Sequence, residues 1–184
     1  MAVPDGAIII GPCPLSRIVL CSADASPNSQ GEYDVEAGYF FPGAKWIGTL
    51  RNASNKLGCR FVILTTGHGM VNPDDVISPY DLHIEKGLND VRTNWRQTIP
   101  RLLGSSSYDI LVFYSGGCPR DHYVQLLRPI LKDLGISLFT YGKPNMFDVG
   151  KTVDIVELLV RGASFVEIKS LLKCPERAEY YHPV

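Results

Sequence analysis

The hydrophobic residues of this chain form short continuous runs that alternate with longer segments of helical period. Continuous apolar runs are typical of strands buried on both faces of a sheet, and five occur, at 7–10, 17–21, 60–64, 109–114 and 136–141. Between them, apolar residues recur every three or four positions after Gly43, from Leu88 to Leu102 and after Pro119, which is typical of amphipathic helices. Residues 151–161 and 165–172 are predicted to form two further helices.

Strands that alternate with helices predict β-α-β crossovers and a parallel sheet. We therefore expect an α/β fold with a mostly parallel sheet of about four or five strands, helices on both faces, and a C-terminal helical pair that closes it. On this interpretation residues 1–150 form the α/β core domain, and residues 151–184 form a helical hairpin extension packed on that core.

Composition narrows the class of protein. The chain has 184 residues, 45% hydrophobic and 20% charged, with a formal net charge of −1, which suits a globular domain and argues against a general binder of polyanions. The five cysteines are scattered without a C-x-x-C pair, so we expect free thiols in a reducing compartment. No apolar stretch approaches the roughly 20 residues of a membrane span. A cytoplasmic protein without a membrane partner is predicted, and its oligomeric state is left open.

The segment from Thr65 to Asp81 is the strongest candidate for a functional loop, because an apolar run ends there in glycines, prolines and polar side chains. Gly67 and Gly69 would let the backbone approach a ligand while His68 points into the site. Tyr80 could stack on a ring, and Asp81 could act as a base or stabilise charge. Alternatively, the aspartates form turns or caps and the tyrosine packs in the core.

Two other loops are expected at the same sheet edge, because ligands of parallel sheets bind beyond the carboxyl ends of the strands. Ser22 and Asp24 follow the strand at 17–21, and Asp24 is a candidate catalytic carboxylate. After the strand at 109–114, Gly116 and Gly117 could offer backbone amides to a ligand, and Tyr123 could face the same space. A tight turn and a core tyrosine are the structural alternatives.

Metal and cofactor chemistry lack local signatures. The four histidines are far apart, and no pair of ligands stands at the spacing of a zinc site. The G-x-x-x-x-G-K, G-x-G-x-x-G and G-x-S-x-G patterns are all missing. We therefore predict no metal and no cofactor. Cys21 is more typical of a buried, unreactive thiol than of a nucleophile.

The segment 156–169 predicts a helix, a glycine turn and a second helix that begins at Ser164, with Glu167 completing a capping box. Such a pair resembles a helix-turn-helix unit, with Lys169 and Lys173 available to a duplex. A plain helical hairpin closing the domain is the alternative.

The order of these motifs resembles a poorly characterised family of small α/β domains related to YaaA-type proteins and to the uracil-DNA-glycosylase-like domain of archaeosine-type tRNA modification enzymes. The resemblance covers about Ile18 to Leu134 and rests most on Pro79-Tyr80-Asp81. It implies an α/β sandwich with a pocket for a nucleobase or nucleoside. Gly67 and His68 occupy the positions of the family's usual lysine and tyrosine here.

Together these features favour an enzyme that acts on a nucleoside, nucleotide or nucleic-acid base, through cleavage of the N-glycosidic bond or base exchange. Asp24, His68 and Asp81 are the expected catalytic residues. The expected substrate-binding residues are Ser22, Gly67, Gly69, Tyr80, Gly116, Gly117 and Tyr123. The partner would be a nucleobase-containing small molecule or a nucleic acid. The alternatives are a non-catalytic nucleic-acid-binding or regulatory module that uses the C-terminal helical pair, and a small-molecule-binding subunit of a larger enzyme.

Overall fold

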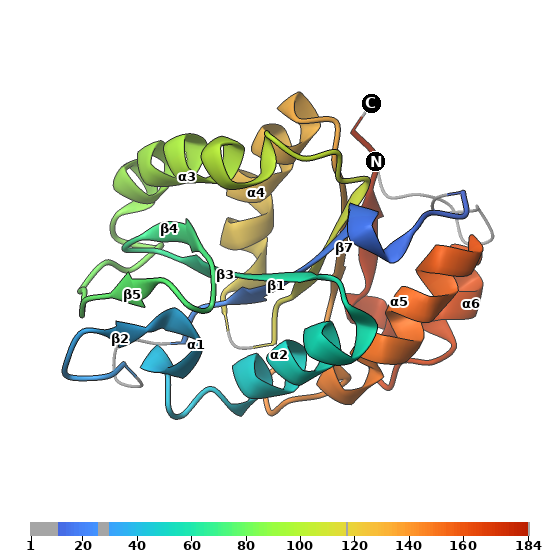
Figure 1. Ribbon diagram of the computed structural model, residues 1–184, viewed down its shortest axis with the longest axis horizontal. Helices are drawn as coiled ribbons and strands as arrows, with labels where there is room; N and C mark the ends of the chain where they lie inside the picture. The colour runs from blue at the N-terminus through green and yellow to red at the C-terminus, as the bar shows by residue number, and fades with distance from the viewer. Residues whose placement is uncertain (1–10, 26–29, 117, 184) are drawn as a thin grey trace.

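A six-stranded mixed sheet forms the centre of the computed structural model, which describes residues 11–25, 30–116 and 118–183 (Figure 1). Four strands are parallel neighbours, β3 (Arg60–Thr65), β1 (Ile18–Ala23), β6 (Ile110–Tyr114) and β7 (Ser137–Tyr141). The α/β class is confirmed. The strand predicted at 7–10 lies outside the described residues.

The expected strand number was too low, because both edges of the sheet carry a short antiparallel strand. β4 (Gly69–Val71) pairs with β3, and β8 (Glu179–Tyr181) pairs with β7. Strands of three residues are too short for a periodic pattern to be recognised in the sequence. Through β8, the segment after residue 150 contributes a strand to the sheet as well as two helices.

Helices cover both faces of the sheet (Figure 1). α3 (Leu88–Leu103) and α4 (Arg120–Asp133) pack on one face. α2 (Lys45–Leu57), α5 (Thr152–Arg161) and α6 (Phe165–Lys169) pack on the other. The short helix α1 (Ala37–Phe40) and a small antiparallel pair, β2 (Val35–Glu36) and β5 (Val76–Ile77), lie at one end of the main sheet. The described residues also form short 3₁₀ helices, η1 (Leu15–Arg17), η3 (Val149–Lys151) and η4 (Pro175–Arg177).

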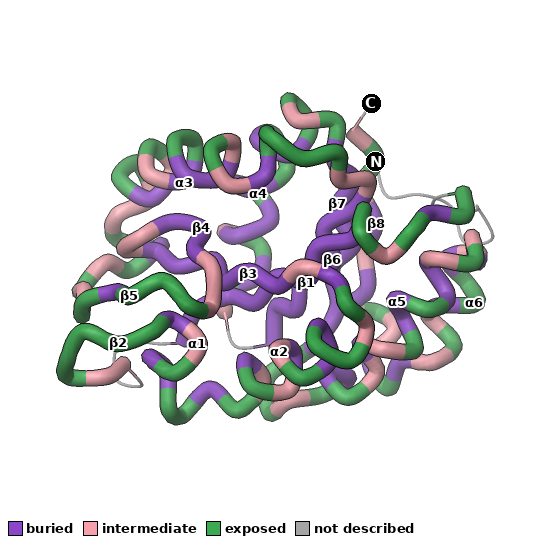
Figure 2. Tube along the Cα trace, in the orientation of Figure 1, coloured by how far each residue is buried: buried purple, intermediate pink, exposed green. Residues whose placement is uncertain are grey.

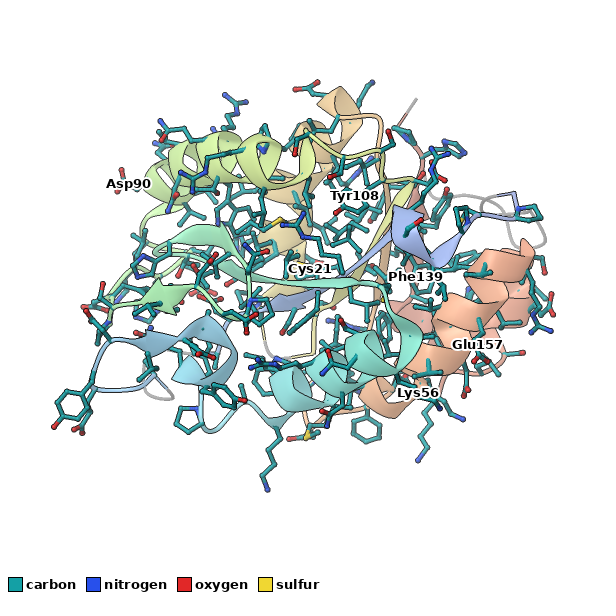
Figure 3. All side chains as sticks on the ribbon, in the orientation of Figure 1. Cys21, Lys56, Asp90, Tyr108, Phe139 and Glu157 are labelled. Carbon is teal, nitrogen blue, oxygen red and sulfur yellow. The ribbon has the colours of Figure 1, made fainter. Side chains whose placement is uncertain are left out.

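Alternate residues of each central strand belong to different cores, one on each side of the sheet. Ile18 and Leu20 of β1 pack with α2, α5 and α6, whereas Val19 and Cys21 pack with α3 and α4. Buried positions therefore run along the whole of β1 (Figure 2). Side chains fill the space on both sides, with Cys21 and Phe139 in the interior (Figure 3). This burial on both faces explains the uninterrupted apolar runs of the sequence.

Two predicted helix ends are confirmed. Gly58 follows α2 in the left-handed conformation with φ of 69°, and its N–H caps the Ser54 carbonyl. Ser164 precedes α6, and its hydroxyl accepts a hydrogen bond from the Glu167 N–H at 3.3 Å. Both helix ends could be predicted from the sequence because a helix cap depends only on residues that are neighbours in the chain.

The C-terminal helical pair differs from a helix-turn-helix unit in length. α6 spans five residues instead of the predicted 165–172, and its Phe165 and Ile168 side chains are buried in the core. Such a short helix leaves little surface for a DNA groove. Among the described residues, no helix has both the length and the apolar character needed to cross a membrane.

Candidate functional site

Asp24 stands directly after β1, at the carboxyl edge of the parallel strands. Its N–H donates to the Leu64 carbonyl at 3.0 Å, so the chain stays paired with β3 up to this residue. Two indoles hold the neighbouring strand ends: Trp46 donates to the Ala23 carbonyl and Trp95 to the Thr65 carbonyl. The Asp24 carboxylate therefore has a position fixed by the sheet.

Four donor groups surround the Asp24 carboxylate. The Tyr123 hydroxyl donates to Oδ1. The Tyr80 hydroxyl donates to Oδ2 at 2.5 Å, and the Thr66 N–H donates to the same oxygen at 3.0 Å. The Thr66 hydroxyl lies 3.1 Å from Oδ2 and 2.6 Å from the Leu82 carbonyl oxygen, and it can donate its single proton to only one of these two acceptors. These contacts bring three predicted site residues, Asp24, Tyr80 and Tyr123, into one cluster.

Burial dominates the electrostatics of this cluster. Asp24 is 4% exposed, and no ion pair of the described residues includes it. Desolvation raises the pKa of its carboxyl group, and the hydrogen bonds from Tyr123, Tyr80 and Thr66 offset this only in part. A carboxyl group with a raised pKa at the end of a strand is suited to proton transfer.

The raised pKa predicts how stability depends on pH. Above the ordinary pKa of 3.8 and below the raised folded value, the folded chain binds more protons than the unfolded chain. The contribution of Asp24 to the free energy of unfolding is therefore fully present below 3.8 and is lost as pH rises through the folded pKa. Urea unfolding across this window should show this loss as a downward slope of the free energy of unfolding against pH in the wild type. The slope should be absent in Asp24→Asn. The slope should persist in the control Asp133→Asn, which alters an exposed residue of α4; equal slopes in all three proteins would contradict the assignment.

A small cavity of about 180 Å³ opens beside Asp24. It is lined by Asp24, Ala25, Thr66, Leu82, His83, Ile84, Glu85, Cys118, Pro119 and Tyr123. Cavities for drug-sized ligands are larger, roughly 300–1,000 Å³. The space therefore fits one planar ring, with apolar walls from Leu82 and Ile84 and a buried carboxyl group on one side.

The loop from Thr65 to Asp81 holds Tyr80 in place. A Cβ at Gly67 would lie 2.3 Å from the Tyr80 ring, so the absence of a side chain at Gly67 permits the contact. His68 packs edge-on against that ring, with centroids 5.3 Å apart, and its Nε2 lies 2.8 Å from the Ser78 carbonyl. His68 therefore supports Tyr80 and is not part of the cavity wall.

The other predicted site residues have varied positions. Gly69 turns the chain into β4 with φ of 74°, and Ser22 is fully buried with its hydroxyl bonded to the Ala23 carbonyl. The Asp81 side chain is 90% exposed and lies 3.5 Å from His83, which lines the cavity. Gly116 packs against the Tyr114 ring. Gly117 lies outside the described residues.

Sequence reasoning missed the segment Leu82–Glu85 and the residues Thr66 and Cys118 as parts of the site. The segment follows Pro79-Tyr80-Asp81 immediately, so the adjacency to that motif was its only signal. Thr66 begins the glycine-rich loop and could have been identified as a donor next to the strand end. Cys118 enters the wall because the loop after β6 brings it there.

Burial determines the protonation of the two thiols near this site. All five cysteines are free, as expected, and burial raises the pKa of the Cys21 thiol far above its ordinary value of 9.0. Burial, followed by the charge of Asp24, likewise raises the pKa of Cys118. Both thiols therefore stay protonated and are poor nucleophiles. Within the described part of the chain, no three His, Cys, Asp or Glu side chains gather as metal ligands.

Comparison with known proteins matches residues 18–140 to a family of unknown function (DUF6884). No curated protein and no solved structure matches the chain. The matched residues contain Asp24, Thr66, Tyr80 and Tyr123, and so the whole hydrogen-bonded cluster. The expected relationship to YaaA-type and uracil-DNA-glycosylase-like domains stays a prediction.

Proposed function

The chain belongs to a family of unknown function, DUF6884, and from the geometry of its Asp24 site we propose that it is an enzyme that cleaves the N-glycosidic bond of a nucleoside or nucleotide. One observation carries this proposal: a buried carboxyl group, without a cationic partner among the described residues, forms one wall of a cavity the size of a single ring. A nucleobase is a planar ring system with polar edges, and it matches the mixed lining of Leu82, Ile84 and Thr66.

Asp24 supplies the proton in this mechanism. When the bond between the sugar and the base breaks, its electron pair moves to the base nitrogen, which takes the proton of the Asp24 carboxyl group. Water adds to the anomeric carbon, and its proton passes to solvent. A buried carboxyl group is suited to this step because its raised pKa keeps more of it protonated than an ordinary aspartate.

The tyrosines have positioning roles. Tyr80 and Tyr123 fix both oxygens of the carboxyl group, and their hydrogen bonds favour its ionised form after the proton has left. Glu85 and His83 stand on the cavity wall as exposed side chains, where they can contact the polar edge of a base. Asp81 contacts His83 and can orient it.

The experiment is release of free base from a panel of nucleosides, nucleoside monophosphates and short single-stranded DNA and RNA oligomers, followed by chromatography. The wild-type protein is expected to release base from at least one class, and Asp133→Asn should do so equally well. Absence of release from every substrate, together with absence of binding, would contradict the proposal.

Tyr123→Phe tests the role of the hydrogen bond to Oδ1. That bond lowers the pKa of Asp24, so its loss is expected to raise the pKa further. The alkaline limb of the rate profile should therefore shift to higher pH, because the acid stays protonated over a wider range. The measurement is the rate of base release against pH in the wild type and the variant. A shift to lower pH would be incompatible with Asp24 acting as the acid.

A further inference from the structure

A second cavity, of about 290 Å³, adjoins the Asp24 cavity. Its walls are formed by Cys118, Pro119, Arg120, Asp121, His122 and Arg177. Cys118 and Pro119 also line the Asp24 cavity, so the two spaces share a wall. A ligand whose ring occupied the first cavity could extend past this wall into the second.

Two arginines that line the second cavity each have a buried Nε without a hydrogen-bond partner in the described part of the chain. Arg120 is 7% exposed, and its Nη2 contacts the Glu179 carboxylate, but its Nε has no hydrogen-bond partner in the described part of the chain. The Nε of half-buried Arg177 likewise has no partner there. Buried donors without acceptors are rare in folded proteins. The two unpartnered N–H groups therefore suggest that a bound ligand supplies an acceptor here. Both arginines line the cavity, and half-buried Arg177 is the more accessible of the two.

The start of α4 adds to this positive surface. The helix spans 14 residues from Arg120 and points its N-terminus at the same cavity, where the helix dipole favours an anion. The negative charge of Asp121 opposes the binding of an anion, because its exposed side chain also lines the cavity. Cys118 of the shared wall lines this cavity together with Arg120 and Arg177.

We propose that the second cavity binds the phosphate monoester of a nucleotide whose base occupies the Asp24 cavity. This inference rests on the proposed function and narrows its substrate class from nucleosides in general to mononucleotides. Guanidinium groups bind phosphate oxygens through paired, charge-assisted hydrogen bonds, and a phosphate in this cavity would lie between the two arginines that line it.

A mononucleotide suits the site better than a nucleic-acid strand. The two arginines line one small cavity, whereas strand binding uses a basic groove that follows the backbone. The formal net charge of −1 also lacks the excess of cations that polyanion binding requires.

The test is calorimetric titration of the full chain with four probes: inorganic phosphate, a set of nucleosides, their monophosphates, and single-stranded oligomers of the same bases. In the wild type, the best monophosphate should bind at least roughly tenfold more tightly than its nucleoside, as charge-assisted bonds imply. Arg177→Gln should remove that advantage while leaving the affinity for the nucleoside unchanged. Asp121→Asn should strengthen monophosphate binding, because it removes the opposing charge. Arg96→Gln, at an exposed position of α3 outside both cavities, is the matched control.

Each outcome decides the inference. A phosphate advantage that is lost in Arg177→Gln and increased in Asp121→Asn supports it. Nucleoside binding without any advantage for the monophosphate overturns the phosphate subsite and leaves the proposed function standing. Binding of inorganic phosphate without any nucleoside or nucleotide overturns the mononucleotide assignment, and the proposed function fails with it. Tighter binding of the oligomer than of the monophosphate overturns the choice of a mononucleotide.

Discussion

Asp24→Asn is expected to lower the rate of base release by about 100-fold or more, the usual contribution of a positioned general acid. Asparagine has nearly the shape of aspartate but cannot deliver a proton at neutral pH. Its amide oxygen can keep the hydrogen bonds from Tyr80 and the Thr66 N–H, and its NH₂ group can donate to the Tyr123 oxygen. The fold and the affinity for substrate should therefore change much less than the rate.

The measurement is the initial rate of base release, with kcat and KM determined separately for the wild type, Asp24→Asn and the surface control Asp133→Asn. A large fall in kcat at nearly constant KM is the expected signature of a lost transition-state interaction. If Asp24→Asn kept the wild-type rate, Asp24 would be a structural residue and the proposed mechanism would lose its acid.

The second large effect is expected from Gly69→Ala, which should lower the free energy of unfolding by about 3–5 kcal/mol through a strained backbone and an overpacked core. Gly69 has φ of 74°, and a Cβ there would lie 2.1 Å from Thr98 Oγ1. Thr98 itself is fixed, because its hydroxyl accepts from the Met70 N–H and donates to the Asn94 carbonyl. The added methyl group therefore has to displace α3 or break the turn into β4.

Gly58→Ala is the matched control, since Gly58 has nearly the same φ of 69° but no atom within 4 Å of an added Cβ. Gly58→Ala should lower the free energy of unfolding only by the cost of a strained backbone, about 1–2 kcal/mol. Urea unfolding of both variants isolates the steric part as the difference between them. Equal losses at the two glycines would mean that the contact with Thr98 contributes nothing.

Local patterns in the sequence determined most of the architecture. The runs at 17–21, 60–64, 109–114 and 136–141 became β1, β3, β6 and β7 within a residue or two at each end, because strands buried on both faces need continuous apolar side chains. Helix periodicity and the capping residues Gly58 and Ser164 likewise determined helices and their ends, because each depends on only a few neighbouring positions. The position of Asp24 at a strand end followed from the same patterns.

Only the tertiary structure decided what Asp24 contacts. Tyr80 and Tyr123 are 56 and 99 residues away in the chain, and packing of the loop after β3 and of α4 brings their hydroxyls to one carboxyl group. The edge strands β4 and β8, the cavity wall at 82–85 and the shared lining of the second cavity by Arg120 and Arg177 arose in the same way. Periodicity reports which side of an element is buried, but the partner across the core depends on the packing of the whole chain, which no local pattern contains.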